Sequence, residues 1–315
     1  MARYLVTGGA GFIGSHLVEA LVAEGHAVRV LDDLSTGRAD NLPSCADLVV
    51  ASVTEPAAIR SAFNDIDGCF HLAAVASVAR AQEAWWQSHQ VNLSGTIAVF
   101  EEAHRQQIAR GRSIPVIYAS SAAVYGNLDQ IPLSEDGRTR PLSPYGADKL
   151  GCEQHAAVAG SLFGLKTIGL RFFNVYGPRQ DPRSPYSGVI SIFCDRLSHN
   201  RPLDIHGDGQ QVRDFVYVAD VVRALQTAMH SANPVPQVFN ICTGNGTTIR
   251  ELAETIARLC GVSLQADYGA GRAGDVRVSV GNPLKASQLL GFGARVSLED
   301  GLGWTLDSIS SDRLP

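Results

Sequence analysis

The chain has 315 residues, of which 45% are hydrophobic and 18% are charged, a composition typical of a folded globular protein and not of a disordered one. Its formal charge is -5, and neither the 26 basic nor the 31 acidic residues form a long run, which argues against nucleic acid as the main partner. No apolar run reaches the roughly 18 residues that span a bilayer, so no membrane partner is expected.

Short apolar runs alternate with helical patterns through the first half of the chain. Runs typical of buried strands are Tyr4–Thr7, Ala27–Leu31, Leu48–Ala51, Cys69–Ala73, Pro115–Ser120 and Lys166–Arg171. Segments of helix length lie between them, at Ile13–Glu24, Pro56–Phe63, Ala84–Arg110 (with a break expected) and Tyr145–Phe163. Repeated strand–helix–strand units predict an α/β fold with a doubly wound parallel sheet of Rossmann type.

The second half of the chain has shorter elements, separated by loops rich in Gly, Pro and Arg. Helices are expected at Ser187–Asn200 and Ile249–Cys260. We therefore expect a dinucleotide-binding domain over 1–172 and a smaller α/β domain over 173–315, with interleaving of the two allowed. The second domain should cover the carboxyl ends of the sheet, where such folds bind ligands.

The cysteines and the N-terminus predict the compartment. Six cysteines lie far apart, with no C-x-x-C pair and no zinc-like spacing, which predicts reduced thiols and no metal site. The N-terminus opens directly into a strand pattern, without the charged region and cleavage site of a signal peptide. We therefore expect a cytoplasmic protein.

The stretch VTGGAGFIGSHL follows the first expected strand and opens the first expected helix. Gly9-x-Gly11-x-x-Gly14 fits the dinucleotide fingerprint, and Thr7-Gly8-x-x-Gly11-x-x-Gly14 fits a variant of it. Glycines let the backbone turn tightly and approach a pyrophosphate, which binds the N–H groups of the helix N-terminus. The strand before and the helix after disfavour the alternative of a purely structural glycine turn.

Asp32 ends the second expected strand in VLDDLSTG. A carboxylate there accepts hydrogen bonds from the adenosine ribose hydroxyls and repels a 2′-phosphate. No basic residue directly follows Asp32, and Arg38 is six positions on. The sequence therefore favours NAD over NADP.

Tyr145 and Lys149, in SPYGADK, are four residues apart at the start of a helical pattern and project from one face. A nearby ammonium stabilises a tyrosinate relative to the phenol, so Tyr145 is a candidate general base. Such a pair is usually structural when it stands alone. The fingerprint upstream and YASS at the end of the fifth expected strand favour the catalytic interpretation.

The chain resembles the extended short-chain dehydrogenase/reductase family, in particular its nucleotide-sugar epimerases. The motifs that carry the resemblance cover nearly the whole chain: TGGAGFIGSHL, LDDLSTG, FHLAA, VNLSGT, YASSAAVYG, SPYGADK, LRFFNVYGPRQ, GDGQQVRDFVYVAD, FNICTGNGTTI and RAGDV. The resemblance implies bound NAD, a nucleotide-sugar substrate in the C-terminal domain, and three sets of site residues. The implied catalytic residues are Ser121, Tyr145 and Lys149. The implied cofactor-binding residues are Gly8, Gly11, Phe12, Ile13, Gly14, Asp32, Val53, Ala73, Ala74, Asn92, Tyr145, Lys149 and Phe172. The implied substrate-binding residues are Ser77, Ser121, Tyr145, Asn174, Gly188, Val189, His206, Arg213, Arg272, Asp275 and Ser279.

The resemblance also implies how the diphosphate is held. Arg213 and Arg272 would clamp it through charge-assisted contacts, with Asn174 on the substrate phosphate and Asp275 on the uridine ribose. Two stretches depart from the family pattern. ASVT replaces the common Gly-Asp after the third strand, placing Ser52 and Val53 near the adenine, and Cys242 replaces a common glycine.

Ala122 and Ala123, directly after Ser121, indicate which reaction of the family to expect. The family's 4,6-dehydratases carry an Asp-Glu pair there, and its decarboxylases carry a Glu one position before Val124. Elimination of water needs an acid and a base near the sugar, and alanine provides neither. We therefore expect an isomerase that epimerises a UDP-sugar at C4 through a 4-keto intermediate with tightly bound NAD.

The sugar is less well specified. Ser279 is a small residue four positions after Asp275, which by resemblance implies room for UDP-GlcNAc and UDP-GalNAc besides UDP-Glc and UDP-Gal. Ser77 matches the same acetamido-accepting subgroup, whereas Ala123 does not. UDP-glucuronate epimerase and NAD(P)-dependent 4-keto-sugar reductase stay open, and a non-catalytic dinucleotide sensor is disfavoured. The resemblance also implies a homodimer formed through 93–110 and 146–163.

Overall fold

The computed structural model describes residues 1–182, 188–233, 235–271 and 275–311. Within these ranges the largest sheet is parallel and has seven strands in the order β11-β6-β5-β4-β1-β2-β3. The strands are β1 (Arg3–Thr7), β2 (Ala27–Asp32), β3 (Asp47–Val50), β4 (Gly68–His71), β5 (Val116–Ser121), β6 (Thr167–Phe172) and β11 (Gln237–Ile241). The predicted α/β fold with a doubly wound parallel sheet is confirmed.

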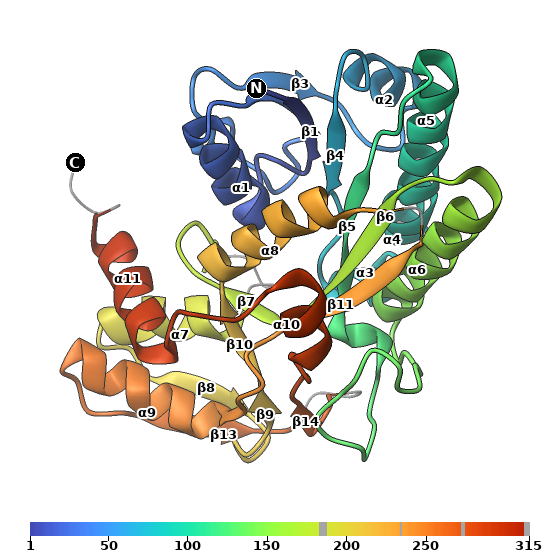
Figure 1. The fold of residues 1–315 in the computed structure, drawn as a ribbon. Coiled ribbons are helices and arrows are strands. Elements are labelled where there is room, and N and C mark those ends of the chain that lie inside the picture. Colours follow the sequence, from blue (N-terminus) through green and yellow to red (C-terminus); the bar gives the residue numbers. More distant parts are fainter. Residues whose placement is uncertain (183–187, 234, 272–274, 312–315) are drawn as a thin grey trace.

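Helices cover both faces of this sheet (Figure 1). One face carries α1 (Phe12–Ala23), α8 (Val218–Ser231) and α10 (Leu284–Leu290), and the other carries α2 (Pro56–Ala62), α5 (Gly95–Arg110) and α6 (Pro144–Phe163). Successive residues of a strand point to opposite faces, so Val6 packs with the first group of helices and Leu5 with the second. Each strand is thus buried on both sides, as the apolar runs predict.

The break expected within Ala84–Arg110 is a π-helical segment, Gln90–Ser94, between α4 (Trp85–His89) and α5. The short helix α3 (Val78–Glu83) precedes it. The wider π turn carries Asn92, which is fully buried. The predicted helix therefore runs without a gap from Trp85 to Arg110, but its hydrogen-bond pattern changes to that of a π-helix over Gln90–Ser94.

The second half of the chain forms small sheets beside the carboxyl ends of the large one. These pair β7 (Asn174–Tyr176) with β10 (Phe215–Tyr217), β8 (Leu203–His206) with β13 (Ala266–Gly269), and β9 (Val212–Arg213) with both β12 (Thr247–Thr248) and β14 (Val278–Ser279). The helices packed on them are α7 (Val189–Ser198), α9 (Ile249–Cys260) and α11 (Leu298–Ser311). Because β11, α8 and α10 join the large sheet, the two halves interleave beyond the expected division at residues 172 and 173.

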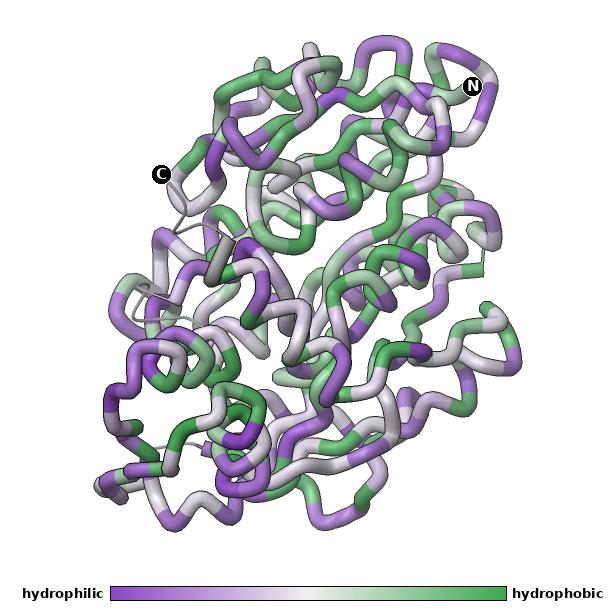
Figure 2. The backbone as a smooth tube through the Cα atoms, turned by 90° about the vertical axis from the view of Figure 1, so that its left-hand side faces the viewer, coloured by the Kyte–Doolittle hydropathy of each residue, from purple (hydrophilic) through white to green (hydrophobic). Residues whose placement is uncertain are grey.

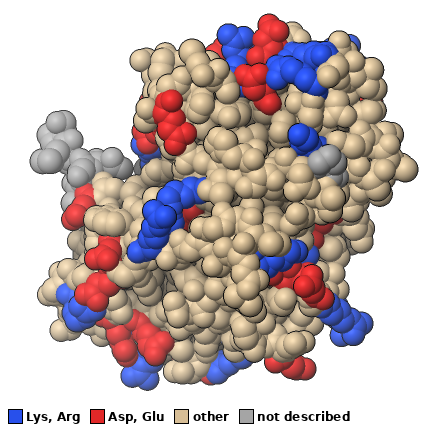
Figure 3. All heavy atoms as spheres, viewed as in Figure 1, with Lys and Arg blue, Asp and Glu red and all other residues tan. Residues whose placement is uncertain are grey.

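Hydrophilic, hydrophobic and charged residues are mixed along the chain (Figure 2) and on the face of the molecule shown in Figure 3. The helices carry hydrophobic and hydrophilic residues in alternation (Figure 2), as expected for elements with one face on a core. Acidic and basic side chains are interspersed on the face in Figure 3. Among the described helices, none combines the length and apolar character that a membrane crossing requires.

Candidate active site

A cavity of about 460 Å³ lies at the carboxyl ends of the central strands of the large sheet. Fifteen of the predicted site residues line it: Gly8, Gly11, Phe12, Ile13, Gly14, Asp32, Val53, Ala73, Ala74, Ser121, Tyr145, Lys149, Phe172, Asn174 and Gly188. They come from the strand ends, the start of α1, the start of α6 and the segment before α7. The structure therefore brings together, in one cavity, most of the residues implied for the cofactor and the reacting group.

The turn between β1 and α1 requires glycine for steric reasons. Gly8 has a positive φ of 69°, and a Cβ atom there would lie 2.6 Å from the backbone nitrogen of Ala73. A Cβ atom at Gly14 would lie 2.1 Å from the carbonyl oxygen of Gly8. Gly11 is the N-cap of α1 and offers no side-chain cap, which leaves N–H groups of the first turn available to an anion. These contacts fit a dinucleotide pyrophosphate.

Asp32 faces the same cavity from the end of β2. Its Oδ2 accepts a hydrogen bond from the Ala10 N–H and its Oδ1 accepts one from the Leu34 N–H, both at 2.9 Å. Burial raises the pKa of this carboxyl, and the two N–H donors offset part of that shift. A carboxylate oxygen accepts more than one hydrogen bond, so both oxygens can still take ribose hydroxyls. The carboxylate fits the adenosine ribose of NAD.

Helix α6 presents Tyr145 and Lys149 to the cavity. Ser143 caps the helix by accepting a hydrogen bond from the Gly146 N–H at 3.1 Å, and Pro144 occupies the first turn. The Lys149 side chain is only 3% exposed, and its Nζ lies 5.9 Å from the centre of the Tyr145 ring. Its ammonium donates to the Ala119 carbonyl at 2.8 Å. A buried cation is thus fixed beside the phenol.

Ser121 projects from the end of β5 and begins the 3₁₀ turn Ala122–Val124. Its Oγ accepts a hydrogen bond from the Ala123 N–H at 3.1 Å. A hydroxyl that accepts from the backbone keeps its own proton for another acceptor. Ser121 can therefore donate to an oxygen of a ligand in the cavity.

His71 does not line the cavity, but it supports a residue that does. It was not among the residues predicted from the sequence. The Thr96 hydroxyl donates to the Asn92 carbonyl at 2.6 Å, so His71 Nε2, at 2.9 Å from Thr96, must carry the proton. His71 Nδ1 then accepts from the Thr7 hydroxyl at 2.7 Å. Burial lowers the pKa of His71 to about 3, which keeps the ring neutral. The Thr7 oxygen in turn accepts from the Ala73 N–H at 3.3 Å and so fixes the cavity wall.

Asn92 lies behind the cavity as well. Its Oδ1 accepts from the Val75 N–H at 2.8 Å, and its Nδ2 donates to the Val75 carbonyl at 3.3 Å. Its side chain therefore acts on the backbone of a residue that lines the cavity. Ser77, two residues after Val75 in the chain, caps α3, where its hydroxyl accepts a hydrogen bond from the Arg80 N–H at 3.1 Å.

A second group of predicted residues lies in the small sheets. Arg213 donates to Asp275 at 2.5 Å and stands opposite Ser279 in the pairing of β9 with β14. Burial lowers the pKa of Arg213, and the Asp275 carboxylate opposes that shift. The group is joined to the cavity because the Asn174 N–H donates to the carbonyl of residue 214 at 3.0 Å.

The remaining predicted residues lie around this group. His206 is exposed at the end of β8, and its carbonyl accepts from the Gln211 amide at 2.7 Å. Val189 begins α7 directly after Gly188. Arg272 lies outside the described residues.

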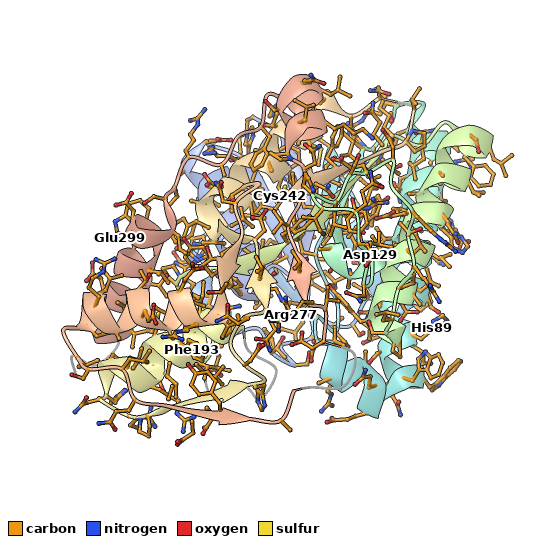
Figure 4. All side chains as sticks on the ribbon, turned by 90° about the horizontal axis from the view of Figure 1, so that it is seen from below. His89, Asp129, Phe193, Cys242, Arg277 and Glu299 are labelled. Atoms are coloured by element: carbon orange, nitrogen blue, oxygen red, sulfur yellow. The ribbon has the colours of Figure 1, made fainter. Side chains whose placement is uncertain are left out.

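The structure adds residues that the sequence did not single out. Gln180, from the motif LRFFNVYGPRQ, lines the cavity, and its buried Oε1 has no hydrogen-bond partner among the residues that the structure describes. Ser35 and Thr36 line the cavity near Asp32. Cys242, labelled in Figure 4, is fully buried among residues that include Phe173, and its sulfur fills the space beside a glycine, Gly281.

The parallel sheet, the glycine turn and the acidic residue at the end of β2 define a dinucleotide-binding α/β enzyme of the short-chain dehydrogenase/reductase class. A family profile described as "NAD dependent epimerase/dehydratase family" matches residues 4–242. The chain belongs to this family, which confirms the resemblance found in the sequence.

Known proteins are similar along almost the whole chain. A UDP-glucose 4-epimerase of Mycolicibacterium smegmatis is 38% identical, with 97% of each chain covered. The crystal structure of a UDP-glucose 4-epimerase with UDP-glucose from Thermotoga maritima has a TM-score of 0.93 and 38% identity, covering 98% of this chain and 99% of the other. A UDP-N-acetylglucosamine 4-epimerase of Methanobrevibacter ruminantium, in complex with UDP-N-acetylmuramic acid, has a TM-score of 0.92 and 32% identity over 99% of both chains.

The position of Asp32 predicts the choice of cofactor. In Asp32→Asn the negative charge that repels a 2′-phosphate is gone, so the preference for NAD over NADP should fall about tenfold or more. The measurement is the ratio of the two cofactors bound after protein stripped of its cofactor is incubated with an equal mixture. Asp40→Asn is the control, because the Asp40 side chain is 89% exposed and should leave the ratio unchanged. An unchanged ratio in Asp32→Asn would contradict this assignment.

Proposed function

We propose that the protein is a UDP-sugar 4-epimerase that interconverts C4 epimers with tightly bound NAD. The observation that carries the proposal is the cavity in which Tyr145, Lys149 and Ser121 meet the glycine turn that fits a dinucleotide. The similar UDP-glucose and UDP-N-acetylglucosamine 4-epimerases support the substrate class. All six cysteines are unpaired, which suits the cytoplasmic location that we also propose.

In this proposal Tyr145 is the base that removes the proton from O4 of the sugar. Lys149 stabilises the negative charge on the phenol oxygen and holds the nicotinamide ribose, while Ser121 donates to O4. Bound NAD would supply the hydride acceptor for C4 and then the hydride donor for the opposite face of the 4-keto sugar. Because the hydride is returned, the protein needs one base and no exchange of cofactor.

The residues after Ser121 favour epimerisation over elimination. Ala122 and Ala123 begin the 3₁₀ turn directly after Ser121, and neither side chain can give or take a proton. NAD that stays bound through purification would support the epimerase, whereas a 4-keto-sugar reductase would need NAD(P)H that exchanges freely.

The nucleotide end of the substrate is assigned to the second group of residues. The Arg213 side chain is 14% exposed, and its hydrogen bond to Asp275 orients the guanidinium group. A diphosphate would replace that partner with two charge-assisted contacts, with Arg272 expected to add more. Asp275 would then be free to accept from the uridine ribose.

The role of Tyr145 predicts a large kinetic effect. Tyr145→Phe removes the acid–base group but keeps the ring, so kcat should fall by about 100-fold or more while NAD stays bound. NMR of both C4 epimers of UDP-glucose, followed over time, measures the rate. Tyr268→Phe, at a side chain that is half exposed on β13, is the matched control and should behave as the unmodified protein. Interconversion near the unmodified rate in Tyr145→Phe would overturn the assignment.

Ser279 predicts which sugars are admitted. It lies on β14 directly opposite Arg213, and by resemblance its small side chain leaves room for an N-acetyl group, so a bulky side chain there would narrow the space for that group. Ser279→Tyr should lower kcat/KM for UDP-GlcNAc at least about tenfold relative to UDP-glucose. The rates are measured on a panel of UDP-sugars that includes UDP-glucuronate, which tests whether the protein is instead a UDP-glucuronate epimerase. Equal losses on every sugar would contradict a gating role.

We further propose a homodimer joined through α5 and α6, which lie side by side on one face of the sheet (Figure 1). Apolar side chains are exposed on both helices, including Ile108 at 68% and Leu162 at 70%. Such a patch is typical of a symmetric interface. Leu162→Glu should convert the dimer to a monomer in sedimentation velocity. Leu289→Glu, at a leucine that is 59% exposed on α10 across the sheet, should not, and a dimer that survives Leu162→Glu would refute the interface.

A further inference from the structure

A buried polar network begins at Ser120, which lines the cavity next to Ser121. The neighbouring Ser120 is 1% exposed, and its hydroxyl donates to Glu153 Oε1 at 2.5 Å. Arg171 binds both oxygens of the same carboxylate, through Nε at 2.8 Å and Nη2 at 2.7 Å. Each of the three side chains is less than one-tenth exposed. The Glu153 carboxylate is thus held on two sides, by a hydroxyl from β5 and by a guanidinium from β6.

The network extends to the segment after Ser121. The Arg171 guanidinium donates to the Tyr125 hydroxyl at 2.8 Å and lies 4.8 Å from the centre of its ring. Burial raises the pKa of Tyr125 to about 12, so its hydroxyl keeps its proton and donates to Asn240 Oδ1 at 2.7 Å. Asn240 is in β11, the strand that the second half of the chain adds to the sheet. Strands β5, β6 and β11 are therefore locked to one another at the edge that bears Ser121.

The same network reaches the catalytic helix. Glu153 lies on α6 eight residues after Tyr145, which is roughly two turns of one rigid helix. Ser120 is two residues after Tyr118, whose side chain packs with α6, so Ser120 faces the same helix. The bond between Ser120 and Glu153 therefore sets the distance between the end of β5 and α6. Ser121 and Tyr145 are carried by those two elements.

We propose that Ser120 and Glu153 are positioning residues that fix Ser121 against Tyr145, an inference that rests on the proposed function. A displacement of about 1 Å between reacting groups can cost about 100-fold in rate. A buried ion pair adds little stability compared with an apolar packing of the same volume, so stability alone does not account for this one. A rigid link between the two elements that carry Ser121 and Tyr145 does account for it.

A double-mutant cycle tests the proposal. Ser120→Ala removes the hydroxyl and should lower kcat about tenfold, with KM for UDP-glucose within about twofold and NAD retained. If Ser120 acts through Ser121, then adding Ser120→Ala to Ser121→Ala should cause no further loss of kcat. Ser120→Cys keeps the size and a weak donor, so its kcat should be intermediate. It replaces Ser120→Ala in the cycle if the alanine variant does not fold.

A matched control separates positioning from stability. Thr305 is 2% exposed in α11, and its hydroxyl donates to the Gly301 carbonyl at 2.7 Å. Thr305→Val should lower the melting temperature by about as much as Ser120→Ala does, and it should leave kcat unchanged. The positioning role would be overturned if the two losses of kcat multiply in the double variant, or if Ser120→Ala changes only KM. Either result would leave the proposed function intact. A kcat equal to that of the unmodified protein in Ser121→Ala would instead contradict the proposed function.

Discussion

The site depends on the parallel pairing of the large sheet, because parallel strands end at the same edge. Thr7 pairs with His71 and with Leu31, and Ser121 pairs with Phe172, so the ends of five strands converge on one cavity. Side chains that are more than a hundred residues apart in the chain therefore meet at this edge. An antiparallel pairing of the same strands would send half of them to the opposite edge.

Buried polar groups keep this edge rigid. His71 is held as a single neutral tautomer between two threonines, and Arg171 is held between a carboxylate and a phenol. Each of these side chains would be costly to bury without its partners. The cavity wall is thus fixed by hydrogen bonds with defined directions, which apolar packing alone does not provide.

The small sheets supply the other half of the site. Their junction with the large sheet is again polar, since the Asp214 carboxylate accepts from the N–H groups of Thr243 and Gly244 and from that of Gly281. Burial raises the pKa of Asp214, and these donors offset part of the shift. A carboxylate ringed by backbone donors joins loops that are distant in the sequence and places Arg213 next to the cavity.

Residue patterns that act locally could be predicted. The glycine turn, the acidic end of β2 and the Tyr-x-x-x-Lys helix depend on neighbours within a few positions, so their spacing in the chain was sufficient to find them. The strands β1 to β6 followed from apolar runs for the same reason. The seventh strand, β11, was missed as a member of the sheet because nothing near Gln237–Ile241 states which partner it pairs with.

The fold class, the cofactor turn and the inert pair Ala122 and Ala123 could be predicted, because each rests on residue type and local spacing. The hydrogen bonds of Asn92 to Val75 and of Ser120 to Glu153, and the place of Gln180 at the cavity, emerged only from the folded chain. These contacts join residues from separate elements, and their geometry exists only after the sheet has brought those elements together. Ser120 and Ser121 are adjacent in the chain and both line the cavity, but the Ser120 hydroxyl is directed at Glu153 on α6, a contact that Ser121 does not share.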